Sequence, residues 1–138
     1  MKSLLALFFL SMSTMAIAHM PDHPALTGVT DRDLKWWGDP DPGIPDHLVS
    51  RNEWPRPEKG SGRAIVTAGG ASGLAYAPLL EIPRGRGVLL LSQLRLVEKL
   101  SVEPIAARIL QNLLDYAASY PDGSRRAVSL IAEDPRYP

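Results

Sequence analysis

The sequence predicts an α/β fold, with a short mixed sheet, one long C-terminal amphipathic helix and a proline-rich N-terminal loop region. Three observations predict it. Residues 101–120 carry an apolar stripe at helical spacing. Three short apolar runs bounded by glycine-rich turns precede this stripe, and residues 19–62 contain more than half of the 13 prolines.

Residues 1–18 have the pattern of a secretory signal peptide. Lys2 precedes an uncharged apolar run, and the small-x-small sequence AIA ends at Ala18. The alternative is a membrane anchor, but the run of about 16 residues is shorter than the ~20 that span a bilayer. The sequence therefore predicts cleavage after Ala18 and a secreted or periplasmic product.

Charge and cysteine content exclude several classes of function. Removing 18 of the 138 residues leaves 120, with a net charge of −1 because Lys2 is lost from a balanced chain. This balance gives no general attraction to nucleic acid or to a membrane after signal cleavage. The chain has no cysteine, so it forms no disulfide and has no thiol nucleophile, and its core alone must hold it together.

Residues 19–62 are expected to form an ordered proline- and tryptophan-rich loop region, because proline disfavours long helices and central strands. One short helix fits residues 31–37, capped by Thr30 or Asp31. Trp36, Trp37 and Trp54 are expected to pin the loops by burying aromatic area. The alternative role for these three rings is stacking on a sugar.

Residues 63–120 are predicted to form a strand–hairpin–helix core. The strands are expected at 64–68, 77–82 and 87–94, and the last is apolar without alternation, as in a strand covered on both faces. The helix is expected over 101–120, with Ser101 as cap and Pro104 in its first turn. Its stripe, expected to be buried against the sheet, consists of Ala106, Ile109, Leu110, Leu113, Leu114 and Ala117.

Residues 121–138 are predicted to be a linker and the start of a further strand over 127–133. A strand after a helix opens another βα unit, which suggests a fragment of a longer protein. The alternative is a strand that adds to the edge of the sheet.

Two glycine-rich turns are candidates for binding loops. AGGASG at 68–73 lacks the glycine spacing of a phosphate loop, which favours a bend or a close backbone approach. PRGRG at 83–87 is explained as a hairpin in which Gly85 supplies a positive φ. Arg84 and Arg86 project from this turn as candidates for gripping a phosphate or carboxylate, or as solvated turn charges.

No catalytic, metal or cofactor site is assigned. His23 and His47, with the nearby Asp22, Asp46 and Glu53, lack metal-ligand spacing, which favours hydrogen-bonded structural histidines. Ser72 in GGASG only approximates a nucleophile elbow, because its glycines do not flank the serine correctly.

Four stretches, taken in order, carry a resemblance to a known family: DHPALTGVTDRDLKWWG, DHLVSRNEWPRPEKG, YAPLLEIPRGRGVLLLSQLRLVEK and EPIAARILQNLLDYAA. Over residues 20–120 they resemble the accessory, glutamine-amidotransferase-like domain of family 2 glycoside hydrolases, the β-galactosidase-like enzymes. The resemblance implies a partial doubly wound, flavodoxin-like layer. It carries over no catalytic residue, because the glycosidase glutamates lie in a barrel that needs roughly 250 residues.

The expected function is therefore a non-catalytic secreted accessory module. The resemblance implies that it packs against other domains or chains of a glycoside hydrolase and borders a carbohydrate site. Two alternatives stay open. One is a small carbohydrate-active hydrolase, a glycosidase or sugar esterase, that works with a partner chain. The other is an interaction module that pairs through an open sheet edge.

Overall fold

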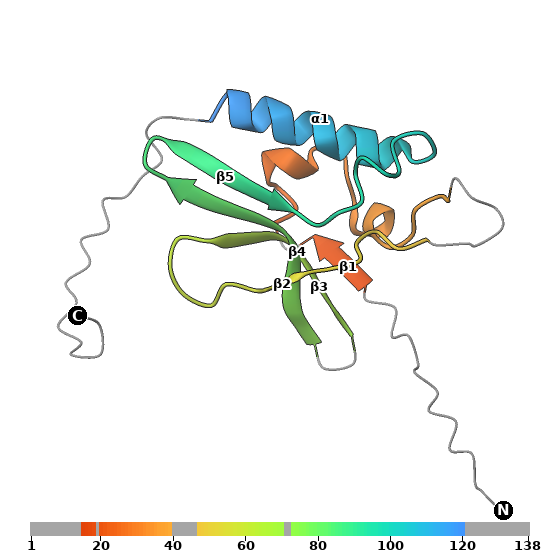
Figure 1. Cartoon of the computed structure of the whole chain (residues 1–138), viewed down its shortest axis with the longest axis horizontal. Coiled ribbons are helices and arrows are strands. Elements are labelled where there is room, and N and C mark those ends of the chain that lie inside the picture. The colour runs from red at the N-terminus through yellow and green to blue at the C-terminus, as the bar shows by residue number, and fades with distance from the viewer. Residues whose placement is uncertain (1–14, 19, 40–46, 71–72, 121–138) are drawn as a thin grey trace, which may run out of the picture.

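The computed structural model describes residues 15–18, 20–39, 47–70 and 73–120. An antiparallel sheet, one α-helix and two short 3-10 helices form a single layered unit (Figure 1). Their bounds are β1 Met15–Ala18, η1 Pro24–Leu26, η2 Asp31–Leu34, β2 Trp54–Pro55, β3 Arg63–Gly70, β4 Gly73–Arg84, β5 Gly87–Ser92 and α1 Pro104–Ala118.

The sheet is organised around β4. Its strand order is β1-β3-β4-β2, and β5 pairs with β4 on the edge that β2 also uses. Every pairing among the described strands is antiparallel, where the sequence predicted a mixed sheet. The reason is that hairpins join β3 to β4 and β4 to β5, whereas parallel pairs need crossover connections such as helices. The α/β character is confirmed, but the described part contains no doubly wound layer.

Both glycine-rich turns are hairpins. Gly85 and Arg86 form the two-residue loop between β4 and β5, and Gly85 has φ 50°, the sign that a type II′ turn requires at its first position. Between β3 and β4, a Cβ on Gly69 would lie 1.8 Å from the carbonyl oxygen of Gly73. Only glycine fits there, so the predicted close backbone approach is confirmed. Ser72 lies outside the described residues.

The main core lies between the sheet, α1 and the loop region. Sheet residues such as Val66 and Leu79 belong to one cluster of buried side chains with Ile109 and Leu113 of α1. The loop region supplies six of its fourteen buried members: Ala25, Leu26, Val29, Leu34, Trp37 and Val49. Residues 19–62 are thus part of the core rather than a peripheral appendage.

The predicted short helix at 31–37 is the 3-10 helix η2. Thr30 is its N-cap, and the Thr30 N–H donates to Asp33 Oδ2 at 2.8 Å. The predicted cap of α1 is wrong, because α1 begins at Pro104 and its N-cap is Glu103 rather than Ser101. The Glu103 carboxylate accepts from the Ile105 N–H at 3.2 Å, and proline at the first helical position has no N–H to satisfy.

Only part of the apolar stripe of α1 is buried. Ala106, Ile109 and Leu113 are buried, whereas Leu114 is 58% exposed and Ala117 is also exposed. The prediction that the whole stripe is covered is therefore wrong for its outer half.

Two other predictions concern segments near the two ends of the chain. Met15–Ala18, the end of the predicted signal peptide, forms β1 and pairs with β3, so cleavage after Ala18 would open that edge of β3. The predicted strand at 127–133 lies outside the described residues. Within the described part, neither α1 nor the short helices are long and apolar enough to cross a membrane.

Leu113→Asp is expected to unfold or aggregate the protein, because it places an unpaired charge between α1 and the sheet. The expected loss is at least about 3 kcal/mol of unfolding free energy, measured by urea denaturation. Ala107→Asp on the exposed face of the same helix is the control and should change stability little. Equal stability of the two variants would contradict the packing described here.

Candidate functional site

The three tryptophans have three different environments. Trp37 is fully buried, and its Nε1–H donates to the Asp33 carbonyl oxygen at 2.7 Å. Trp54 in β2 is half-buried against a small second cluster of Ala64, Ala77 and Leu80. Trp36 is 69% exposed. The pinning role is thus confirmed for Trp37 and wrong for Trp36, which leaves Trp36 as the accessible aromatic face.

Trp36 is held in a defined position. Its ring stacks on His47 with centroids 4.4 Å apart and planes 20° apart. His47 Nδ1–H donates to the Trp37 carbonyl oxygen at 2.9 Å, and the Trp37 N–H donates to the His47 carbonyl oxygen at 3.2 Å. The Gly38 N–H donates to Glu103 at 3.1 Å, which fixes the next residues to the start of α1. The result is a preorganised, exposed indole.

The remaining predicted ligand residues lie elsewhere. Arg84 and Arg86 are exposed at the β4–β5 turn, which Figure 1 places at the opposite end of the sheet from η2 and its neighbour Trp36. Trp54 pairs with Ala77 of β4 and packs against the second cluster of buried residues. The five residues therefore do not form one site.

The histidines also lie apart. His47 stacks on Trp36, Glu53 accepts from the Ser50 hydroxyl at 3.3 Å, and His23 belongs to a separate buried network. Asp46 lies outside the described residues. Among the residues that the structure describes, no group of three His, Cys, Asp or Glu side chains is placed to hold a metal ion.

The most concentrated polar chemistry surrounds Glu81, whose side chain is fully buried in β4. His23 Nε2 lies 2.8 Å from Glu81 Oε2, and the Tyr116 hydroxyl donates to the same oxygen at 2.7 Å. Arg63 Nε donates to Glu81 Oε1 at 3.0 Å, and a second guanidinium nitrogen of Arg63 contacts that oxygen more closely. The carboxylate thus joins β4 to the loop region, to β3 and to α1.

The electrostatics of this network favour an ionised glutamate. Burial raises the pKa of Glu81, but hydrogen bonds from Tyr116, Arg63 and His23 and the charge of Arg63 outweigh it, so the net pKa lies below the ordinary 4.5. The pKa of Tyr116 is raised well above its ordinary 10.0 by burial and by its hydrogen bond to Glu81. Both groups are therefore held in their ordinary charge states at neutral pH.

His23 has no ring nitrogen left for proton transfer. The Ala25 N–H donates to Nδ1 at 3.1 Å, which makes Nδ1 an acceptor and places the ring proton on Nε2, facing Glu81. The ring also meets Tyr116 edge to face, with centroids 4.7 Å apart. A general base needs a free lone pair toward the substrate, which this arrangement does not provide.

Two surface hollows flank the network and share Arg63, whose side chain is half exposed. One, of about 390 Å³, is lined by residues 20–24, Arg63 and Tyr116. The other, of about 680 Å³, includes Arg56, Glu58 and Arg63 in its wall. The guanidinium faces these hollows already paired with Glu81, so it supplies little uncompensated positive charge.

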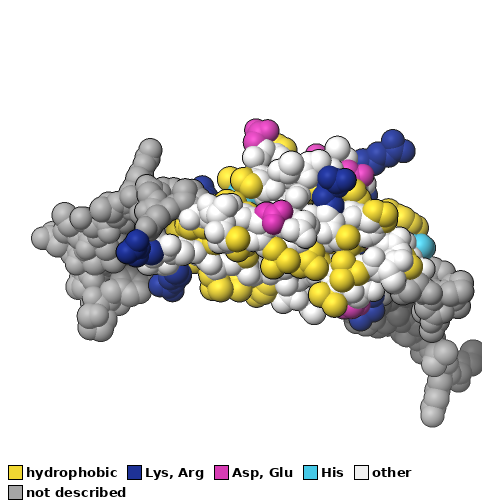
Figure 2. Space-filling view, turned by 90° about the horizontal axis from the view of Figure 1, so that it is seen from above, with side chains coloured by type: hydrophobic (Ala, Val, Ile, Leu, Met, Phe, Trp, Pro, Cys, Tyr) yellow, Lys and Arg dark blue, Asp and Glu magenta, His cyan; other side chains and the backbone are white. Residues whose placement is uncertain are grey.

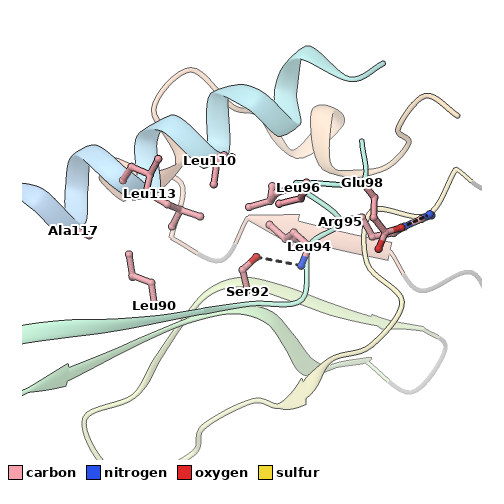
Figure 3. Close-up of a pocket in the computed structure, with 11 residues that line it drawn as sticks. Leu90, Ser92, Leu94, Arg95, Leu96, Glu98, Leu110, Leu113 and Ala117 are labelled. Carbon is pink, nitrogen blue, oxygen red and sulfur yellow. Dashed lines mark hydrogen bonds and ion pairs between the residues drawn. The ribbon is translucent and has the colours of Figure 1, made fainter. Parts of the chain in front are cut away.

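A third hollow is apolar and lies between β5 and α1 (Figure 3). It measures about 450 Å³, and Leu90 of β5 points toward Leu113 and Ala117 of α1 across it. Seen from the α1 side, hydrophobic side chains are exposed along this face, with charged groups scattered among them (Figure 2).

The sequence did not lead us to predict a role for Glu81, although it contains a signal for one. The residue interrupts APLLEI, a run predicted to be a strand, and a charge inside an apolar strand requires a partner if the strand is buried. The partners could not be found in the same way, because His23 is 58 residues away and Tyr116 is 35 residues away along the chain.

No family model, curated protein or solved structure matches the chain. The likeness to the accessory domain of family 2 glycoside hydrolases therefore depends on the four quoted stretches alone.

Glu81→Gln is expected to cost about 2 kcal/mol of unfolding free energy at pH 7, because it removes a buried ionic acceptor of three groups while Arg63 keeps access to water. Because the folded pKa of Glu81 is lowered, its stabilisation is present above pH 4.5 and is lost as pH falls through the folded value. Denaturation of wild type should therefore show falling stability with acid, and Glu81→Gln a weaker dependence.

Glu58→Gln is the matched control, since Glu58 is an exposed carboxylate that lines a hollow together with Arg63. It should leave both the stability at pH 7 and its acid dependence nearly unchanged. If Glu81→Gln behaves like this control, the network does not stabilise the fold.

Proposed function

We propose that this chain is a non-catalytic, secreted accessory module that borders a carbohydrate site and packs against other domains or chains of a glycoside hydrolase. The proposal takes its class of partner from the resemblance over residues 20–120, and with it a flavodoxin-like relationship of the fold. Among the three tryptophans, Trp36 is the ring that is both exposed and held in place, which supports it as the contact residue.

The Trp36 platform is the observation that carries the proposal. Aromatic faces provide large, rigid contact area at low cost in conformational entropy. Stacking on His47 covers one face of the indole and leaves the rest of the ring to solvent. A sugar ring, or the edge of a partner domain beside a sugar, can lie on such a surface.

The chemistry of the Glu81 network supports a role without catalysis. Glycosidases use two carboxyl groups on either side of the scissile bond, one of them available as an acid. Glu81 is instead a single buried carboxylate, held ionised by three hydrogen-bond donors. This arrangement stabilises the junction of three elements and presents no acid to a substrate.

Trp36→Ala is expected to weaken binding of a galactoside by at least about tenfold, since aromatic anchors carry a large share of binding energy. The measurement is an NMR titration of the full chain with lactose and with a β-linked galactobiose. Tyr76→Ala, at an aromatic residue 46% exposed on β4, is the control and should bind as wild type does. Binding that survives Trp36→Ala would contradict the platform.

The hydrolase alternative is tested with the same preparations. Wild-type protein at high concentration should release no nitrophenol from aryl β-galactosides or from aryl acetates. Turnover that disappears in Glu81→Gln, while Glu58→Gln keeps it, would replace the accessory role with an enzymatic one.

A further inference from the structure

The uncovered surfaces of β5 and α1 adjoin each other. The outer half of the helix stripe, Leu110, Leu114 and Ala117, lines the apolar groove together with Leu90 of β5 (Figure 3). In β5, Leu90 is only half-buried, although the strand is almost entirely apolar. Apolar residues left open on two neighbouring elements indicate that another segment covers them.

β5 also has one edge whose backbone groups pair with no described strand. Gln93 N–H donates to the Pro78 carbonyl oxygen at 2.8 Å, and Gly87 and Arg84 close the hairpin at the other end. In an antiparallel ladder the bonded positions alternate, so residues 89 and 91 bond to β4. Val88, Leu90 and Ser92 direct their N–H and C=O groups to the other edge, where no described strand pairs with β5.

The chirality of the chain determines where this edge lies. When a strand runs upward and an L-residue's side chain faces the viewer, its N–H and C=O groups point right. Leu90 faces α1 and points its backbone groups away from β4. Seen from α1, β4 is therefore on the left of β5 and the open edge is on the right. A strand added there after α1 makes a right-handed crossover, the hand found in about 98% of such connections.

The chain itself supplies a suitable strand. Residues 127–133 read AVSLIAE, and their alternation places Val128, Leu130 and Ala132 on one face. α1 runs opposite to β5 and ends above the β4–β5 turn (Figure 1), so a strand that follows it starts level with the beginning of β5. Residues 119–126 provide about 26 Å of reach at roughly 3.3 Å per residue, enough to return from the helix to the sheet.

We propose that residues 127–133 pair in parallel with the open edge of β5 and close the groove beneath α1. Val128, Leu130 and Ala132 then face Leu110, Leu114 and Ala117, and β5 becomes an internal strand. This gives the sheet one parallel pair and makes β5, α1 and the added strand a βαβ unit. The inference is independent of any sugar contact at Trp36.

Amide hydrogen exchange of the full chain, followed by NMR, tests the proposal. The Val88 and Leu90 amides are expected to exchange slowly, as the Leu89 and Leu91 amides do through their bonds to β4. Leu130→Asp should speed exchange at Val88 and Leu90 by at least about tenfold and leave Leu89 and Leu91 little changed. Ser129→Asp, on the opposite face of the segment, is the control and should preserve the protection.

Unprotected Val88 and Leu90 amides in the wild type would overturn the proposal. Protection that depends on protein concentration would also overturn it, because a second copy would then occupy the edge. So would equal effects of Leu130→Asp and Ser129→Asp.

Engineered cysteines test the direction of the pairing, and the absence of native cysteine makes the result unambiguous. Val88→Cys combined with Val128→Cys should form an intramolecular disulfide, because neighbouring strands lie within disulfide reach. Val88→Cys combined with Ala132→Cys should not, since four residues along a strand span about 13 Å. Preference for the second pair, or no disulfide in the first, overturns parallel pairing.

Discussion

The structure depends on one buried carboxylate. Glu81 accepts hydrogen bonds from His23 in the loop region, Arg63 in β3 and Tyr116 in α1, so one side chain joins three parts of the chain to β4. A buried charge is costly unless its partners are all in place, which makes the correct assembly of these elements a condition for a stable fold. The same saturation removes the carboxylate from chemistry, because none of its partners is free to exchange a proton with a substrate.

The loop region shows how a proline-rich segment without long elements becomes part of a core. Leu26, Leu34 and Trp37 are buried with the residues of α1, and short 3-10 helices satisfy the local backbone. Because Trp37 points into the core, its neighbour along the chain, Trp36, lies on the surface. The exposed ring is thus a consequence of how the core is built, which is why its position is well defined.

The open edge of β5 bears on which partners the chain binds. An exposed apolar strand edge is a liability, because it pairs with other chains. Closure by residues 127–133 would leave the Trp36 side of the molecule as the surface for contacts, whereas an open edge would favour pairing between molecules. The two candidate roles, accessory module and edge-pairing module, therefore differ in what covers one groove.

The sequence alone determined β3, β4, β5 and α1, because each of these elements depends on local pattern. The stripe of 101–120 predicted α1, Gly85 predicted the β4–β5 turn, and the runs at 64–68 and 77–82 predicted β3 and β4. Tertiary structure decided which tryptophan is exposed, that Glu103 caps α1, and that Glu81 meets His23 and Tyr116. These features arise from contacts between residues far apart along the chain, and periodicity and turn chemistry carry no information about which distant side chains will meet.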